Sequence, residues 1–151
     1  MFKVAILVDL ELGLKSGGHV KFWENIYLSL KSKSSVDLTF FFLGKKRKVY
    51  ISDKILIKTN KPIISSKILR VIGVDADHTD IFFFNPWLFF ELKNFDLIHT
   101  TDQLYCMSNT AKLASKFWEI PLTTSYHTDA PSYSKYYVKK IFDNFPKLLK
   151  D

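Results

Sequence analysis

The pair Gly17–Gly18 stands at a junction where flexible residues could serve a ligand. The two glycines come shortly after the apolar run FKVAILVDL, and an apolar-striped segment begins directly after them. Glycines at such a junction let the backbone approach a ligand closely and expose amide donors at the start of a helix, which suits a phosphate group. A tight turn before a helix is the alternative interpretation, and the spacing alone does not choose between the two.

His127 is the side chain that we single out for hydrogen-bonding or proton-transfer chemistry. It follows the run PLTTSY, and an imidazole there can donate to, or accept from, a substrate hydroxyl near neutral pH. The alternative is a strand-end histidine that bonds a neighbouring loop. Thr128 and Asp129 follow His127, and Thr101 and Asp102 occupy the same position after the run DLIHT.

The other histidines have a simpler interpretation. His99 lies inside DLIHTT, and we expect a structural histidine whose ring nitrogens are satisfied. His78 stands among Asp75, Asp77 and Asp80, a composition that suggests a metal site. Because no second histidine lies at ligand spacing, we expect a hydrogen-bonded loop there instead.

Several common site motifs do not occur. The glycine spacing is not the GxGxxG fingerprint of dinucleotide-binding proteins, which argues against a nicotinamide enzyme, and no GxxxxGK[ST] loop is present. No pair of carboxylates suited to a glycoside hydrolase stands out.

The elements that position these residues alternate between strands and helices. Apolar runs predict strands over 3–8, 36–43, 96–101 and 121–126, with a hairpin or one bent strand over 47–59. Helices are expected over 20–30, 61–73, 86–94, 104–119 and 131–150, and an irregular loop over 74–86. Such alternation is typical of an α/β domain with a mostly parallel sheet. Since ligands bind beyond the carboxyl ends of parallel strands, the candidate residues are expected to meet at that edge.

Length and composition fit one domain with a large core. The chain has 151 residues, and 47% of them are hydrophobic. No segment reaches the roughly 18 consecutive apolar residues that a membrane-spanning helix needs, and no secretory signal pattern opens the chain. The single cysteine, Cys106, excludes an internal disulfide and is expected to be buried in a helix. We therefore expect a cytoplasmic protein.

The net charge of +7 suggests an anionic partner without naming one. Lys45, Lys46, Arg47 and Lys48 form a run, for which solvated surface lysines are the favoured interpretation. A weak association with a membrane surface remains a hypothesis for the whole chain. Nucleic-acid binding is disfavoured, because no nucleic-acid motif is present and the aromatic residues lie in core-like runs.

Four segments taken together resemble one family. The ordered set SGGHVKFWENI, DHTDI, FDLIHTTDQLY and IPLTTSYHTDAPSYSKYY resembles the N-terminal domain of family 4 (group 1) glycosyltransferases of GT-B fold. The likeness runs from Lys3 to about Tyr137. The IHTTD and SYHTD elements are its most specific parts, and the glycine pair is weakly specific.

The resemblance implies a fold, a reaction and roles for the candidate residues. The fold would be a single Rossmann-like domain, one half of a GT-B enzyme. The reaction would be a retaining transfer of a sugar from a nucleotide-diphosphate sugar to a lipid or cell-envelope acceptor, with no metal and no other cofactor. By the same resemblance, the glycines would approach the donor diphosphate and His127 would lie near the transferred sugar. Thr101, Asp102, Thr128 and Asp129 would face the cleft.

One departure from the family bears on activity. Family members have a second Rossmann-like domain that holds most donor contacts and a paired-glutamate motif, and residues 1–151 contain no such motif. We expect residues 1–151 to be the acceptor-side domain and to have little transferase activity alone. A split enzyme, in which a separate chain supplies the donor-binding domain, is one interpretation. A truncated remnant or a non-catalytic module that binds phosphate or sugar remains the alternative. Location at the inner membrane face, as a peripheral protein, fits such an acceptor.

Overall fold

The computed structural model describes residues 1–13, 17–31, 34–72 and 78–127, together with residues 132, 135, 136, 138, 139 and 142. Two of the site candidates, Thr128 and Asp129, lie outside the described residues. So do most of the terminal helix expected over 131–150 and part of the loop expected over 74–86.

A six-stranded sheet forms the centre of the protein, in the order β3-β4-β2-β1-β5-β6. Every neighbouring pair is parallel except β3 and β4, which form an antiparallel hairpin. The hairpin resolves the alternative left open for residues 47–59. The strands are β1 (Lys3–Glu11), β2 (Asp37–Leu43), β3 (Arg47–Ser52), β4 (Ile55–Asn60), β5 (Leu97–Thr100) and β6 (Leu122–Thr124).

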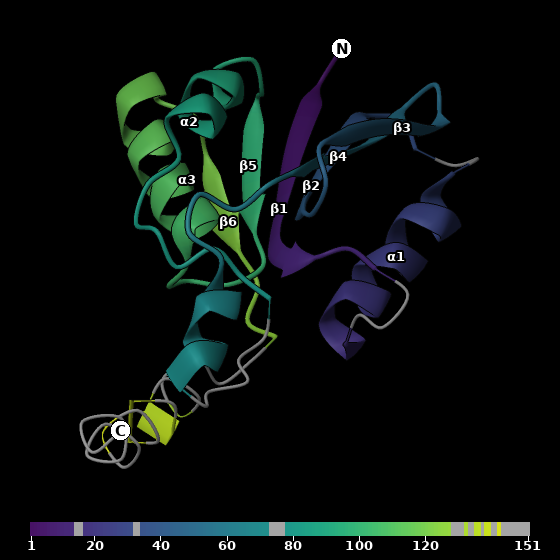
Figure 1. The fold of residues 1–151 in the computed structure, drawn as a ribbon. Helices are drawn as coiled ribbons and strands as arrows, with labels where there is room; N and C mark the ends of the chain where they lie inside the picture. The colour runs from purple at the N-terminus through teal and green to yellow at the C-terminus, as the bar shows by residue number, and fades with distance from the viewer. Residues whose placement is uncertain are drawn as a thin grey trace.

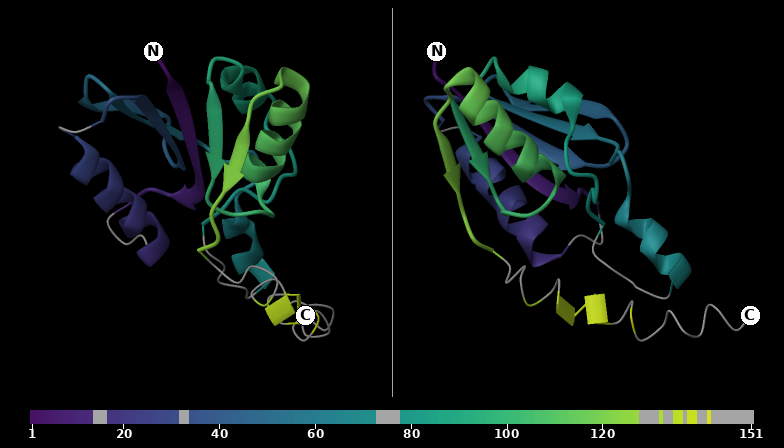
Figure 2. Two further views of the ribbon diagram at one scale, coloured as in Figure 1. Left: turned by 180° about the vertical axis from the view of Figure 1, so that it is seen from behind. Right: turned by 90° about the vertical axis from the view of Figure 1, so that its left-hand side faces the viewer.

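Helices cover both faces of the sheet (Figure 1). Helix α1 (Gly18–Leu30) lies on one face, and α2 (Pro86–Leu92) and α3 (Cys106–Trp118) lie on the other. A 3-10 helix, η1 (Ser66–Ile72), projects beyond the edge at which the parallel strands end, as the two views in Figure 2 show. The expectation of a mostly parallel α/β sheet flanked by helices, consistent with a Rossmann-like domain, is confirmed.

Alternation along the central strands divides the core into two layers. Side chains of successive strand residues point to opposite faces, so Val4, Ile6 and Val8 of β1 pack towards α1. Ala5 and Leu7 of the same strand pack towards α2 and α3. Strand β2 repeats the arrangement with Phe40 and Phe42 on the α1 side and Phe41 on the other. Strands buried on both faces explain the continuous apolar runs in the sequence.

Local signals set the ends of the two helices on the far face. Asn85 caps α2, since its side chain accepts a hydrogen bond from the amide of Leu88 at 3.0 Å, and Pro86 follows at the first helical position. Helix α3 ends at Trp118 and is capped by Glu119, which adopts a left-handed conformation with φ of 56°. Its small residues Ala111 and Ala114 are fully buried, which lets the helix lie close to the sheet. Among the described residues, no helix combines the length and apolarity that spanning a bilayer requires.

Substituting Phe41 with alanine should destabilise the domain severely. Phe41 is 0% exposed and packs edge-on against Phe95, so its truncation should lower the free energy of unfolding by about 3–5 kcal/mol. Urea denaturation measures this loss. Phe83→Ala is the control, because Phe83 is 67% exposed and its truncation should cost far less. Equal losses in the two variants would contradict the core assignment.

Candidate functional site at the carboxyl edge of the sheet

Three of the four histidines gather where α1 begins and where β5 and β6 end. The rings of His19 and His127 are stacked, with centroids 4.7 Å apart and an interplanar angle of 24°. The ring of Trp23 lies 5.6 Å from that of His127 and 5.4 Å from that of His99. We call these four side chains, together with Ser125, the histidine cluster. It brings the start of α1 and the segment after β6 together at one place.

Ser125 joins two of these histidines through hydrogen bonds. Its Oγ lies 2.8 Å from Nε2 of His127 and 3.0 Å from Nε2 of His99. A hydroxyl has one hydrogen, so at most one of these nitrogens can accept it and the other must donate an N–H if both bonds are made. The remaining nitrogen of His99, Nδ1, lies 2.9 Å from Oγ1 of Thr123. The expectation that His99 is satisfied is therefore confirmed, but His99 is also part of the site rather than separate from it.

The pairing of β5 with β6 and the start of α1 determine where the residues of the histidine cluster lie. Strands β5 and β6 run in parallel with His99 opposite Thr123, so the chain leaving β6 passes beside His99. His19 is the second residue of α1, and Trp23 follows it by four residues on the same helix face. The exposed ring of His127 then closes over His19.

Burial keeps the imidazoles neutral. Loss of surrounding water, and to a smaller extent the nearby His127, lowers the pKa of His19 from 6.5 to about 4. Burial, and next the nearby His127, lower the pKa of His99. The ring of His127 is exposed, and partial loss of the water around it lowers its pKa. At pH 7 the histidine cluster is an uncharged hydrogen-bonding surface rather than a cationic one.

Two polar atoms of the histidine cluster have no partner within the described part of the chain. Nε2 of His19 and Nε1 of Trp23 are buried there without a hydrogen bond. A buried polar group without a partner costs about 1–3 kcal/mol, and such groups in native proteins call for a ligand, a water or a functional reason. Both lie in the same cluster as His127, which marks this place as the candidate site.

The glycine pair lies directly before the cluster. Gly17 is the N-cap of α1, with φ of −68° and ψ of 177°, and no side-chain hydrogen bond caps the helix. A Cβ added at Gly17 or Gly18 would meet no atom within 4 Å. Neither strain nor packing therefore demands glycine at these positions in this conformation.

Thr101 and Asp102 reach the same edge, where the Asp102 carboxylate is engaged by backbone amides and the Thr101 hydroxyl is buried without a hydrogen-bond partner in the described part of the chain. Thr101 is 1% exposed, and its amide donates to the carbonyl of Leu7 at 3.1 Å. Oδ1 of Asp102 accepts hydrogen bonds from the amides of Leu104 and Tyr105, both at 3.2 Å. Burial raises the pKa of Asp102. These two positions shape the start of α3 next to the histidine cluster.

The loop around His78 is hydrogen-bonded, as expected. Nδ1 of His78 lies 2.7 Å from Oε2 of Glu11, and Nε2 lies 2.9 Å from Nη2 of Arg70. The carboxylate of Asp80 accepts from the amides of Ile63 and Ile64, at 2.8 and 3.0 Å. Asp75 and Asp77 lie outside the described residues, and in the described ranges no group of histidine, cysteine and carboxylate side chains could hold a metal ion.

Cys106 is not placed to act as a nucleophile. It is fully buried at the first position of α3, and burial together with Asp80 and Asp9 raises the pKa of its thiol. The expectation of a buried helical cysteine is confirmed.

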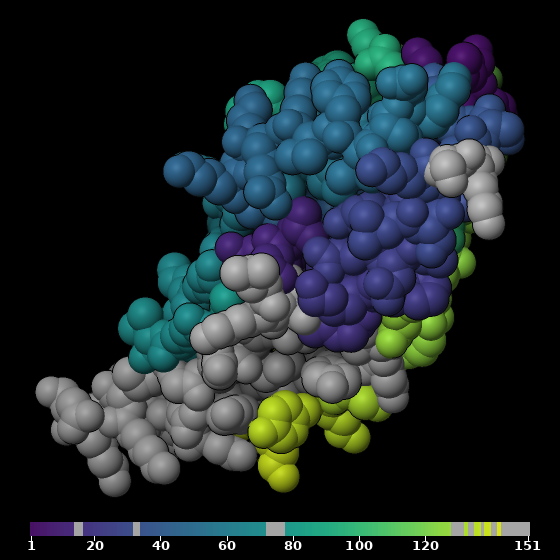
Figure 3. Space-filling model, turned by 90° about the vertical axis from the view of Figure 1, so that its right-hand side faces the viewer, coloured from purple at the N-terminus to yellow at the C-terminus, as the bar shows by residue number. Residues whose placement is uncertain are grey.

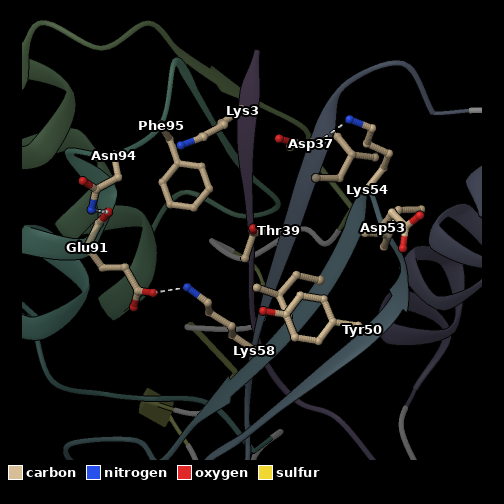
Figure 4. Close-up of a pocket in the computed structure, with 13 residues that line it drawn as sticks. Lys3, Asp37, Thr39, Tyr50, Asp53, Lys54, Lys58, Glu91, Asn94 and Phe95 are labelled. Atoms are coloured by element: carbon tan, nitrogen blue, oxygen red, sulfur yellow. Dashed lines mark hydrogen bonds and ion pairs between the residues drawn. The ribbon is translucent and has the colours of Figure 1, made fainter. Parts of the chain in front are cut away.

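The two cavities described here lie away from the histidine cluster, and none of its residues lines them. The larger cavity, about 300 Å³, lies at the opposite edge of the sheet among the starts of β2 and β4 and the end of α2. Figure 4 shows Lys58 reaching towards Glu91, and Lys54 towards Asp37, across this cavity. Its lysines and acids are equal in number: Lys3, Lys54 and Lys58 against Asp37, Asp53 and Glu91. A second cavity of about 190 Å³ lies where β1, β2 and β4 end.

Sequence reasoning missed His19, Trp23 and Ser125. Two signals were available: His19 follows the glycine pair directly and shares a helix face with Trp23 at a spacing of four. Ser125 and His127 are two apart in an extended segment, which places them on the same side. Neither signal shows that the segment around His19 contacts the segment around His127.

No protein-family model matches this chain, and no curated protein matches it either.

The folded domain should lose stability as the pH falls below 6.5. The pKa of His19 is near 4 in the folded protein and near 6.5 in the unfolded chain, so the unfolded chain takes up a proton first. The loss should run from about pH 6.5 to about pH 4. Urea denaturation across this range should show a shallower pH slope for His19→Phe, which keeps a flat ring and removes the titration. The same slope in both proteins would show that His19 titrates alike in the two states.

Removing the Ser125 hydroxyl should remove the hydrogen bonds that link His99 to His127. Ser125→Ala leaves Nε2 of His99 without its partner, so the free energy of unfolding should fall by about 1 kcal/mol. The nitrogen chemical shifts of the His99 ring should also change, which NMR detects. Thr124→Ala is the matched control, because the Thr124 hydroxyl makes only 3.4 Å contacts. If both variants change the His99 ring equally, Ser125 is not its partner.

Proposed function

We propose that residues 1–151 form the acceptor-side half of a retaining glycosyltransferase of GT-B fold, which transfers a sugar from a nucleotide-diphosphate sugar. The observation that carries the proposal is the stacking of His127 on His19. His127 belongs to the SYHTD element of the resemblance and His19 to its SGGH element. Two segments far apart in the sequence thus meet at the edge where parallel sheets bind ligands.

The chemistry of the site suits a sugar rather than a charged group. Because partial loss of surrounding water lowers the pKa of His127, its ring is neutral at pH 7 and can donate to or accept from a sugar hydroxyl. Its exposed position leaves it accessible, while Ser125 and His19 fix its ring. His127 would orient the transferred sugar or the acceptor hydroxyl.

The start of α1 suits the donor diphosphate. The first amides of a helix lack partners within the helix and carry a partial positive charge. No side-chain hydrogen bond caps this end of α1, and a side chain at Gly17 or Gly18 would meet no atom within 4 Å of its Cβ. Amides at this place would stabilise the charge that develops on the leaving diphosphate.

Residues 1–151 supply one wall of such a cleft, and a second Rossmann-like domain would supply the donor-binding wall. The acceptor would be a lipid or a cell-envelope glycan, reached at the inner membrane face. If the cluster binds sugar or phosphate without transferring it, the chain is a binding module instead, and the following experiment separates the two.

His127→Ala should greatly lower the rate of transfer while leaving the fold intact. The chain is purified from its native cell with the proteins that bind it, and transfer from a panel of nucleotide-diphosphate hexoses is measured. Transfer should fall by about 100-fold or more, with an unchanged melting temperature, and His127→Gln should retain part of the activity because its amide still hydrogen-bonds. The exposed Lys116 on α3 provides a control variant, Lys116→Ala.

Two results would overturn parts of this proposal. An unchanged rate in His127→Ala would remove His127 from the reaction. Robust transfer by the purified chain alone would show that it needs no second wall. Binding of a nucleoside diphosphate that shifts the amide signals of Gly17 and Gly18, with no transfer in any complex, would favour the binding module.

A further inference from the structure

The smaller cavity, about 190 Å³ in volume, differs from the larger one in its charge. It lies at the carboxyl ends of β1, β2 and β4, the edge at which parallel sheets bind ligands. Among the described residues, three lysines line it, Lys45, Lys61 and Lys67, and one carboxylate does, that of Glu11. The described lining of this cavity therefore carries two more positive than negative charges, whereas the positive and negative charges that line the larger cavity are equal in number.

Strand pairing brings two of the lysines together. Strands β2 and β4 are parallel neighbours, and Leu43 lies opposite Asn60 at their ends. Lys45 follows the first strand end by two residues and Lys61 follows the second by one, so both emerge at the same place. Figure 3 shows the end of β1 at the surface between the β3–β4 hairpin and α1.

The backbone at Lys45 is fixed. Gly44 has φ of 149°, a conformation that favours glycine, and its amide donates to the carbonyl of Asn60 at 2.9 Å. The hydroxyl of Thr59 donates to the carbonyl of Lys45 at 2.5 Å. The turn that delivers Lys45 to the cavity is therefore tied to the end of β4.

The single carboxylate in the wall is already engaged. Oε2 of Glu11 lies 2.7 Å from Nζ of Lys67 and 2.7 Å from Nδ1 of His78. The hydrogen bond from Lys67 is the main cause that lowers the pKa of Glu11. Lys45 and Lys61 make no ion pair with any carboxylate in the described part of the chain, so their ammonium groups are available to a ligand.

A neutral donor completes the wall. Oγ of Ser65 accepts a hydrogen bond from the amide of Lys67 at 3.3 Å, and its own hydrogen remains able to point to a ligand oxygen. Ammonium groups bind phosphate as point charges. The cavity also exceeds the roughly 30 Å³ that a water molecule takes up in the liquid, which leaves room for a phosphate and a small organic part.

We propose that this cavity binds a small phosphate monoester, held by the ammonium groups of Lys45, Lys61 and Lys67 and by the hydroxyl of Ser65. The site is separate from the histidine cluster and from the glycine pair, and it does not depend on sugar transfer. The phosphate belongs either to a soluble ester or to a lipid headgroup, and the test below distinguishes these sources.

Binding is measured by calorimetry and NMR with glycerol 3-phosphate as the soluble probe, and by co-sedimentation with vesicles that contain phosphatidic acid. Glycerol 3-phosphate should shift the amide signals of Gly44 and Lys61 and leave that of His127 in place. Lys45→Gln and Lys61→Gln should each weaken binding about tenfold, as expected for the loss of a charge-assisted contact. Neither lysine is buried, so both variants should fold.

Lys48→Gln is the matched control, because Lys48 belongs to the same basic run but lies on β3 away from the cavity. It removes the same charge and should leave binding unchanged. Vesicle binding that depends on Lys61, without binding of the soluble ester, would support the site with a lipid source. Equal weakening by Lys48→Gln and Lys61→Gln would overturn the proposal, since it would show general attraction to a basic surface. Absence of binding to both probes would overturn it as well.

Discussion

The carboxylate of Asp9 holds together the edge of the sheet on which the candidate sites depend. Asp9 is 1% exposed near the end of the central strand β1. Its Oδ2 accepts from the amide of Met107 at 2.7 Å, at the start of α3, and its Oδ1 accepts from the hydroxyl of Thr79 at 3.3 Å. A carboxylate at a helix start is favoured by the unpaired amides and the helix dipole. Burial and the nearby Asp102 raise the pKa of Asp9, while the hydrogen bonds from Met107 and Asp80 oppose that rise.

The sheet extends to both sides of β1, the strand that carries Asp9. Strands β2 and β4 follow on one side, and β5 and β6 on the other, so the strand order reverses beside β1, the place where open α/β sheets form a crevice. The histidine cluster uses α1, β5 and the end of β6. The lysine-lined cavity uses the ends of β1, β2 and β4. One buried carboxylate thus stabilises an edge that carries both.

The two sites differ in the charge that they offer. Burial lowers the pKa of all three clustered histidines, which leaves neutral rings, an indole and a hydroxyl for hydrogen bonding. In the cavity, Lys67 and His78 engage Glu11, and Lys45 and Lys61 remain as cations. A neutral polyol and a phosphate would therefore be recognised at different places on the same edge.

The pattern of apolar runs by itself determined the succession of strands and helices and the mostly parallel sheet. It also predicted that the glycine pair, Thr101 and His127 would share one edge, because parallel strands end on the same side. Only the tertiary structure decided which residues meet there. The sequence alone suggests a structural role for His99, because its partner Ser125 is 26 residues away. It suggests that Lys45 is one of several solvated lysines, because only the pairing of β2 with β4 brings Lys61 near it. Local periodicity records which face of an element is buried, whereas contacts between distant residues follow from strand order, which no local pattern encodes.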